Sequence, residues 1–252
     1  MLRAFLTPRW ILTTLLVLLA VGLMARLGIW QLDRLEQRRA FNARVQAQLD
    51  SPPLDLAAAL ADGTMTPEKL NDLEYRGVVL RGEYRPQEQI ILRNQIWENQ
   101  PGAHLLTPLY LQGTNYAVLV DRGWIPMNEN TPADWQQYHQ LGRLEVRGIL
   151  QRTQDARRFG AADPTAVPGV VVPAWNAVRL ERIAVQVSAD LLPAYVLAAP
   201  AGGSQSADGP PYAMLAAPDL SEGSHMGYAL QWFSFAAVLG FGYPFFVKKQ
   251  LS

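Results

Sequence analysis

Hydrophobic residues gather in two long runs, one near each end of the chain, and the sequence between them alternates apolar and polar positions in short segments. The first run covers residues 10–30 and is interrupted by one charged residue, Arg26. The second covers residues 226–247 and contains no charged residue. A helix of about 20 apolar residues crosses a bilayer core of roughly 30 Å. Both runs therefore predict membrane-spanning helices.

Basic residues beyond the two runs predict the orientation. Arg3 and Arg9 precede the first run, and Lys248 and Lys249 follow the second, which favours cytoplasmic ends. The predicted order is a cytoplasmic N-terminus (1–9), a transmembrane helix (10–30), an extracytoplasmic domain (31–225), a second transmembrane helix (226–247) and a cytoplasmic C-terminus (248–252). The first run exceeds the usual 7–15 apolar residues of a signal peptide, so we favour a retained anchor over a cleaved one.

The middle of the chain predicts one β-rich α+β domain. Helix formers continue the first helix to about residue 49, and short helices are expected at 54–61 and 180–189. Alternating and β-branched residues predict strands at 75–84, 89–94, 104–112, 115–121, 144–152 and 194–198. Gly77 and Gly82 suggest bulges or a close approach within the first strand. A hairpin turn is expected at 112–115 and a Gly/Pro/Ser/Ala-rich loop at 200–211. The expected sheet is mostly antiparallel.

Composition narrows the function. The 22 Lys and Arg residues balance the 22 Asp and Glu residues, so no net charge favours nucleic acid as a partner. The absence of cysteine excludes disulfides, Cys-ligated zinc, thiol catalysis and c-type haem attachment. The sequence also lacks a Ser-His-Asp order, paired carboxylates, a phosphate loop and zinc-ligand spacing. We therefore expect that the protein is not an enzyme.

The three histidines differ in their surroundings. His139 lies in a polar stretch and is expected on the surface, whereas His104 opens a strand and is expected to be structural. His225 stands at the entrance to the second apolar run, on one helical face with Tyr228 and Trp232. This face fits either an interfacial aromatic belt or a haem site with the imidazole as axial ligand.

Two charged positions are also candidates. Arg26 lies inside the first apolar run, one turn before Trp30, where it either extends outward to the membrane surface or pairs with an acidic group such as a haem propionate. Residues 121–124 (Asp-Arg-Gly-Trp) close a predicted strand, where they form either a structural or a catalytic corner.

Four sequence blocks occur in a fixed order between and within the two apolar runs. They are LGIWQLDRL at 27–35, Gly102 with LTPL at 106–109, VDRGWIP at 120–126 and HMGYALQWF at 225–233. In this order, the chain resembles the surfeit locus protein family of cytochrome c oxidase assembly factors, the Shy-type proteins, over essentially its whole length. That family usually carries two Asn before the histidine of the last block and Leu after it, whereas Gly223, Ser224 and Met226 stand here.

The resemblance implies a role in inserting haem a into subunit I of cytochrome c oxidase. The family's histidine corresponds to His225 and its Trp-Gln pair to Trp30 and Gln31. The implied cofactor is transient haem a, and the implied partners are oxidase subunit I, membrane lipid and, as a further candidate, haem a synthase. The expected location is a bacterial inner membrane with the central domain in the periplasm, or the mitochondrial inner membrane.

We expect a haem site near the outer leaflet, between two spans that pack side by side with Gly22 and Ala229 at the contact. Its expected members are His225 as the iron ligand with Trp232, Tyr228, Arg26 and Trp30. Arg34 is a second candidate for the propionates. The alternative is a cofactor-free chaperone that holds nascent subunit I, since interfacial aromatic residues also bind partner helices.

Overall fold

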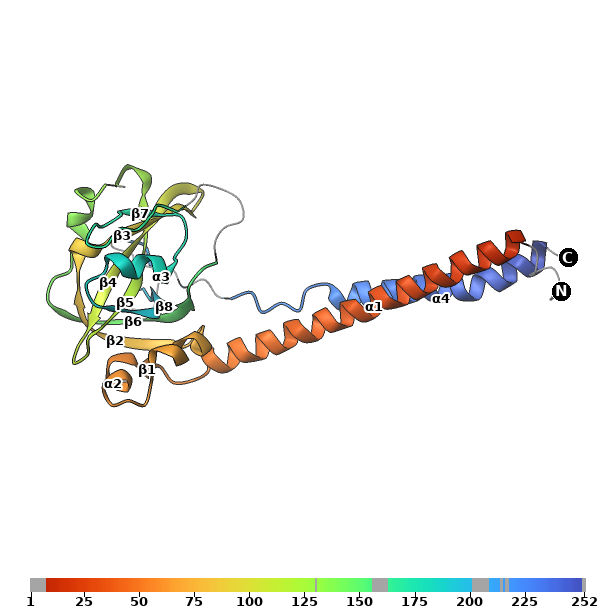
Figure 1. The fold of residues 1–252 in the computed structure, drawn as a ribbon, viewed down its shortest axis with the longest axis horizontal. Coiled ribbons are helices and arrows are strands. Elements are labelled where there is room, and N and C mark those ends of the chain that lie inside the picture. Colours follow the sequence, from red (N-terminus) through yellow and green to blue (C-terminus); the bar gives the residue numbers. More distant parts are fainter. Residues whose placement is uncertain are drawn as a thin grey trace. The chain divides into compact units, whose positions relative to one another are not determined.

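The computed structural model describes residues 8–129, 131–155, 163–200, 209–213, 215 and 218–250. Contacts divide the chain into two compact units. One comprises Met1–Arg44 with Pro218–Ser252, and the other Val45–Ala217. The first unit contains long helices from both ends of the chain, and the second contains the β-sheet (Figure 1).

Helices α1 (Pro8–Leu49) and α4 (His225–Gln250) lie alongside one another and run antiparallel (Figure 1). Both are long and apolar enough to cross a bilayer. As the sequence predicts, α1 continues without a break beyond its apolar run to Leu49. The antiparallel direction follows from the pairs that meet along the two helices: Trp10 with Phe246, Thr14 with Tyr243, Gly28 with Phe233, and Gln31 with His225.

The contact between α1 and α4 repeats every seven residues, which is the spacing of a coiled-coil seam. On α4 this seam contains Ala229, Phe233, Ala236, Gly240, Tyr243 and Val247. On α1 it contains Thr14, Val21 and Gly28. Ala229 is buried, as expected, but the expectation for Gly22 is wrong, because a Cβ there would meet nothing within 4 Å. Gly28 takes that role, since its missing side chain leaves room for the ring of Phe233.

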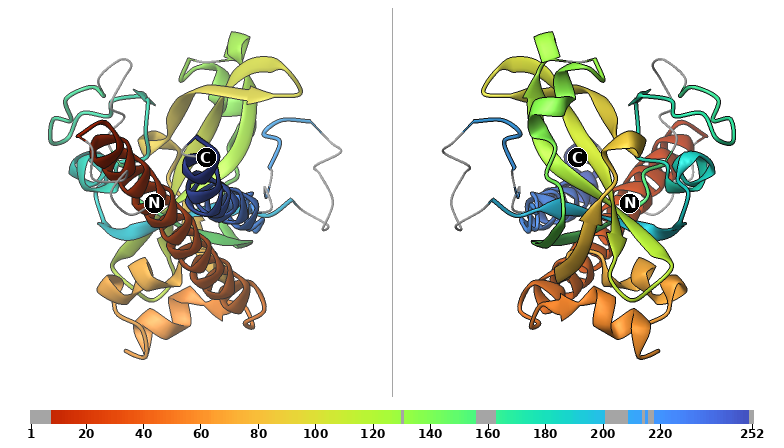
Figure 2. Two further views of the ribbon diagram at one scale, coloured as in Figure 1. Left: turned by 90° about the vertical axis from the view of Figure 1, so that its right-hand side faces the viewer. Right: turned by 90° about the vertical axis from the view of Figure 1, so that its left-hand side faces the viewer.

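The second unit is built on eight strands that form one curved sheet (Figure 2). They are β1 (Leu54–Asp55), β2 (Gly77–Tyr84), β3 (Ile90–Trp97), β4 (Gln100–Leu111), β5 (Tyr116–Pro126), β6 (Arg143–Arg152), β7 (Ala174–Trp175) and β8 (Asp190–Ala198). Pairing in the order β2–β6–β8–β5–β4–β2 closes five of them into a barrel. Only the β5–β8 pair of this ring is parallel.

The barrel closes where β2 meets β4, and Gly82 permits that closure. A Cβ on Gly82 would lie 2.1 Å from the carbonyl oxygen of Tyr110, so only glycine fits between the two strands. This confirms the close approach expected at this position. β3 and β7 continue the sheet outside the ring from β4, and the short β1 pairs with β2.

Side chains on the two faces of the sheet form separate cores. One core combines Val78, Leu80, Leu109, Val118, Val120, Leu150 and Val196 with Leu56 and Leu70, which come from α2 (Leu56–Ala61) and the 3₁₀ helix η2 (Pro67–Leu73). The alternate residues Leu119 and Tyr195 belong to the other core, with Trp175 and α3 (Leu180–Ile183). Alternation along β5 and β8 thus places apolar side chains on both faces.

The main strands agree with the sequence-based expectation, and the turn between β4 and β5 is confirmed, with Gly113 at φ +76°. The helix expected at 180–189 is shorter: α3 is followed by the 3₁₀ helix η6 (Ala184–Gln186). β8 begins at Asp190 rather than at 194, because its first residues pair with the start of β5. Most of the loop expected at 200–211 lies outside the described residues.

Candidate functional site

His225 begins α4 and its imidazole is held by a side chain of α1. The Nδ1 atom lies 2.8 Å from Oε1 of Gln31, and both side chains are half-buried. Because an amide oxygen only accepts hydrogen bonds, Nδ1 carries the proton and donates it. In the neutral ring, the lone pair then resides on Nε2. A neutral imidazole with one nitrogen fixed by an amide and the other free is the usual state of a metal-ligating histidine.

The backbone just before His225 leaves Nε2 accessible. A Cβ on Gly223 would lie 3.7 Å from Nε2 and 3.6 Å from Cδ2 of the ring. Any larger residue at 223 would therefore occupy space beside the free nitrogen. Gly223 also has φ of +67°, in the left-handed region that glycine adopts without strain.

Polar side chains of α1 fix the segment that leads into α4. Arg39 donates two hydrogen bonds, of 2.8 and 2.9 Å, to the carboxylate of Glu222. Arg38 donates to the backbone oxygen of Ser221 at 3.0 Å, and Asn42 donates to that of Leu220. Exposed ion pairs add little stability, but a two-pronged contact from a planar guanidinium restricts geometry. These contacts therefore position the residues immediately before His225.

Most of the other residues expected at this site are more exposed than His225. Trp30 is 46% exposed and Tyr228 is 50% exposed. Trp232 is half-buried, and its ring meets Phe235 edge-on with centroids 6.2 Å apart. Arg26 is exposed and forms no hydrogen bond or ion pair with another described residue. Arg34 is also exposed and donates to Gln37 of its own helix at 3.1 Å. The structure thus joins His225 to Gln31, half-buries Trp232, and leaves the other expected aromatic and basic residues exposed on the helices.

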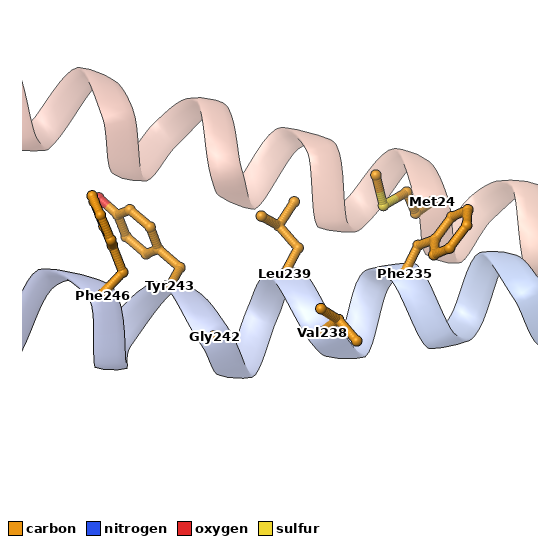
Figure 3. A pocket seen from close by; sticks show the side chains of 7 residues that line it. All are labelled: Met24, Phe235, Val238, Leu239, Gly242, Tyr243 and Phe246. Carbon is orange, nitrogen blue, oxygen red and sulfur yellow. The ribbon is translucent and has the colours of Figure 1, made fainter.

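An apolar hollow of about 420 Å³ lies further along the two helices (Figure 3). Met24 of α1 forms one wall, and α4 contributes Phe235, Val238, Leu239, Gly242, Tyr243 and Phe246. The Tyr243 hydroxyl lies 2.8 Å from the Thr14 hydroxyl. This hydrogen bond satisfies the polar end of Tyr243 within the apolar surface. His225 does not line this hollow.

In the barrel unit, residues 121–124 form a structural corner. One carboxylate oxygen of Asp121 lies 2.8 Å from Nδ1 of His104, and the other accepts from the Gly123 amide at 3.0 Å. Burial opposes charging of His104, but the hydrogen bond and charge of Asp121 outweigh it and raise the pKa of His104 above its ordinary value. These contacts agree with the structural role expected for His104.

Beyond this corner, β5 pairs with a segment far along the chain. Trp124 and Tyr212 exchange two backbone hydrogen bonds, of 3.0 and 2.8 Å. The ring of Tyr212 stacks on Trp97 with centroids 4.2 Å apart, and Trp124 lies beside both rings. This aromatic cluster fixes Tyr212 thirteen positions before the start of α4 along the chain.

The model of the SURF1 family matches residues 18–237. The chain belongs to the SURF1 family. This confirms the resemblance inferred from the four sequence blocks.

Relatives of the SURF1 family match over different lengths. The SURF1-like protein of Rickettsia conorii is 27% identical over 247 residues, which cover 95% of this chain and 93% of that protein. Surfeit locus protein 1 of Mus musculus is 24% identical over 147 residues, or 53% of this chain and 46% of the mouse protein. Cytochrome oxidase assembly protein SHY1 of Saccharomyces cerevisiae is 29% identical over 113 residues, or 45% of this chain and 28% of the yeast protein. The chain thus spans less than half the length of the mouse and yeast relatives.

Gln31 contacts the His225 ring but was not among the site residues predicted from the sequence. The Trp-Gln pair after the first apolar run is one of the matched blocks, but only the tryptophan was considered for the site. Gly223 and Ser224 stand before the histidine in this chain, and the amide that contacts the ring is that of Gln31 on the other helix. The signal available in the sequence was the position of the Gln31 amide directly after the first apolar run.

Proposed function

We propose that this SURF1-family protein is an assembly factor for cytochrome c oxidase that holds haem a for insertion into subunit I. In this proposal α1 and α4 cross a bacterial inner membrane, and the barrel lies on the periplasmic side. The name of the yeast relative, cytochrome oxidase assembly protein SHY1, supports the assembly role. The observation that carries the cofactor proposal is the Gln31–His225 hydrogen bond, because it leaves Nε2 free as a ligand.

The donor set at this site fits a haem group. A haem supplies an iron centre that accepts an imidazole nitrogen, and His225 presents one whose proton is held on the opposite side of the ring. Gly223 keeps the approach to Nε2 open. The aromatic rings of Trp30 and Tyr228 are exposed and available to a flat apolar ligand, and Arg26 is a cation for its carboxylates.

A scaffold without a cofactor is the second candidate, and the hollow beside Met24 favours it. This hollow opens on the apolar surface of the two helices and could receive side chains of a helix from oxidase subunit I (Figure 3). Such packing would hold the nascent subunit without any ligand to iron.

A visible spectrum distinguishes the two candidates. The full-length protein is produced together with the haem a synthesis enzymes, purified in detergent and measured by pyridine haemochrome analysis. We expect a haem a signal that is lost in His225→Ala and retained in Met226→Ala, the exposed neighbouring position. A protein that carries no haem but co-purifies with subunit I would refute the cofactor proposal and support the scaffold.

Gln31→Leu tests whether the amide positions the imidazole. Loss of an outer hydrogen bond to a ligating histidine typically weakens binding by about 10–100-fold. We expect haem retention to fall by this amount and the Soret band to shift, because the ring loses its fixed orientation. Gln46→Leu, the same change at an exposed position of α1 whose side chain contacts Asp50, is the control. Equal haem retention in the two variants would show that Gln31 has no positioning role.

A further inference from the structure

A second hollow lies within the barrel unit. It has a volume of about 280 Å³ and is bordered by residues before β3 and around the 3₁₀ helix η5 (Asp134–Tyr138). Trp135, Pro132 and Pro173 give it apolar walls, and Gln87 and Gln136 lie on its exposed rim. No aspartate or glutamate is among the described residues that line it.

Gln89 lines this hollow and has an unused hydrogen-bond donor. The residue is 2% exposed, and its Oε1 accepts from the Thr107 hydroxyl at 2.7 Å and from Nη1 of Arg122 at 3.4 Å. Two donors on one atom identify that atom as the oxygen, so Nε2 is the donor end of the amide. Nε2 is buried and has no hydrogen-bond partner among the described residues. A buried donor without a partner is costly, so a group from outside that accepts its hydrogen bond would be stabilised.

Arg122, which donates to Oε1 of Gln89, is a buried cation with no counterion among the described residues. It is 7% exposed, donates from Nη2 to the backbone oxygen of Tyr138 at 2.6 Å, and lies 4.8 Å from the centre of the Tyr84 ring. Burial raises the pKa of Tyr84 to about 12, so that hydroxyl is neutral. None of the ion pairs among the described residues includes Arg122. The end of the hollow at Gln89 therefore faces an uncompensated positive charge.

From this arrangement we infer that the hollow binds a small carboxylate with a flat apolar body. The carboxylate accepts the hydrogen bond of Gln89 Nε2, and the amide transmits the charge of Arg122, because hydrogen bonds in series polarise one another. The apolar body packs against Trp135 and the two prolines. Nε2 is sealed from solvent, so the exposed side chains of the rim move aside when the ligand enters.

The test compares an acid with its own amide on the full-length protein in detergent. The probes are 3-phenylpropionate and 3-phenylpropionamide, which share the apolar body and differ in the charged group. NMR of ¹⁵N-labelled protein follows the side-chain amide of Gln89 and the indole N–H of Trp135. We expect saturable shifts of both signals with the acid and at least tenfold weaker binding of the amide. Equal affinities for the two probes, or no saturation by the acid, would overturn the inference.

A third probe distinguishes a free small molecule from the end of a protein chain. A tetrapeptide ending in phenylalanine carries the same ring and carboxylate on a peptide backbone. Tighter binding of the peptide than of 3-phenylpropionate would identify a chain terminus as the source. Weaker binding would identify a free acid, and either order supports a carboxylate site.

Gln89→Glu tests the role of Arg122 in two ways, through ligand binding and through the stability of the ligand-free protein. The new carboxylate replaces the amide donor and provides the missing counterion, so we expect binding of 3-phenylpropionate to fall at least tenfold and the melting temperature to rise. Gln112→Glu, the same change in the exposed turn between β4 and β5, is expected to alter neither. A Gln89→Glu protein that binds the acid like wild type, or that melts at a lower temperature, would contradict the proposed arrangement.

Discussion

Replacing Gly123 with alanine would insert a methyl group where the backbone of Tyr212 crosses β5. A Cβ at this position would lie 2.4 Å from the carbonyl carbon and oxygen of Tyr212, and 2.5 Å from the amide nitrogen of Ala213. These are backbone atoms, so rotating a side chain cannot relieve the overlap. Gly123 also has φ of +121°, which a residue with a Cβ rarely adopts.

The size of the destabilisation follows from the backbone strain at residue 123 and the contacts of Tyr212 that would be lost. A non-glycine residue held in such a conformation costs about 1–3 kcal/mol. Moving Tyr212 away also breaks its two backbone hydrogen bonds with Trp124, each worth about 0.5–1.5 kcal/mol. Its stacking on Trp97, at 4.2 Å, is worth about 0.5–1.5 kcal/mol more. Together these contributions predict that Gly123→Ala lowers the free energy of unfolding by roughly 2.5–7.5 kcal/mol, a large part of the roughly 5–15 kcal/mol that stabilises a typical domain.

Urea denaturation of the detergent-solubilised protein, followed by tryptophan fluorescence, measures this loss. Gly113→Ala is the matched control, because Gly113 also has a positive φ, of +76°, but a Cβ there would meet nothing within 4 Å. The control should lose only the conformational cost, about 1–2 kcal/mol. Tyr212→Leu removes the ring but leaves the backbone pairing intact, so it should be less destabilising than Gly123→Ala. If Gly123→Ala were no more destabilising than Gly113→Ala, the argument from close approach would be wrong.

Two further predictions concern the helix pair and the His104–Asp121 pair. Gly28→Leu should separate α1 from α4, since even a Cβ at this position would lie 2.7 Å from the Phe233 ring. Overpacking of this kind costs about 1–3 kcal/mol, and unfolding in SDS measures the loss. Gly22→Leu is the control and should have no such effect, because a Cβ there would meet nothing within 4 Å. Because the pKa of His104 is raised above 6.5 in the folded protein, its contribution to stability is fully present below pH 6.5 and is lost as the pH rises through the raised value. Melting temperatures between pH 5 and 9 should show this decline in wild type, and a flat profile in Asp121→Asn would confirm its cause.

The strands of the barrel were predictable because local signals agree with the tertiary structure. Alternating and β-branched residues mark most of the strands, and the turn at 112–115 fixes the register between β4 and β5. Closure of the barrel was not predictable, because the β2–β4 and β5–β8 pairs join segments that no local pattern relates. Gly82 gave a hint of close approach, but it did not identify the strand that approaches.

The candidate sites show the same division. His225 stands out in the sequence, because a lone imidazole at the start of an apolar run is unusual in any chain. Its partner Gln31 lies 194 positions away, and only the pairing of the two helices reveals the contact. Likewise, only the structure identifies Gln89 and Arg122 as a candidate site. It shows that the buried Gln89 amide lacks an acceptor and that the buried Arg122 lacks an anion among the described residues.

The chemistry proposed for His225 depends on the fit of α1 against α4. Gly28 and Gln31 lie one turn apart on α1, and Phe233 and His225 lie two turns apart on α4, so the close contact and the hydrogen bond occupy one continuous seam. A separation of the helices at Gly28 would therefore draw the amide of Gln31 away from Nδ1 and release the imidazole, although neither residue had changed. Binding at Nε2 is linked to helix pairing by this geometry: a ligand that requires the oriented ring stabilises the paired helices, and a partner that opens the pair weakens the ligand's hold. In the proposed function the protein retains a cofactor and then releases it, and the Gln31 amide would supply this linkage.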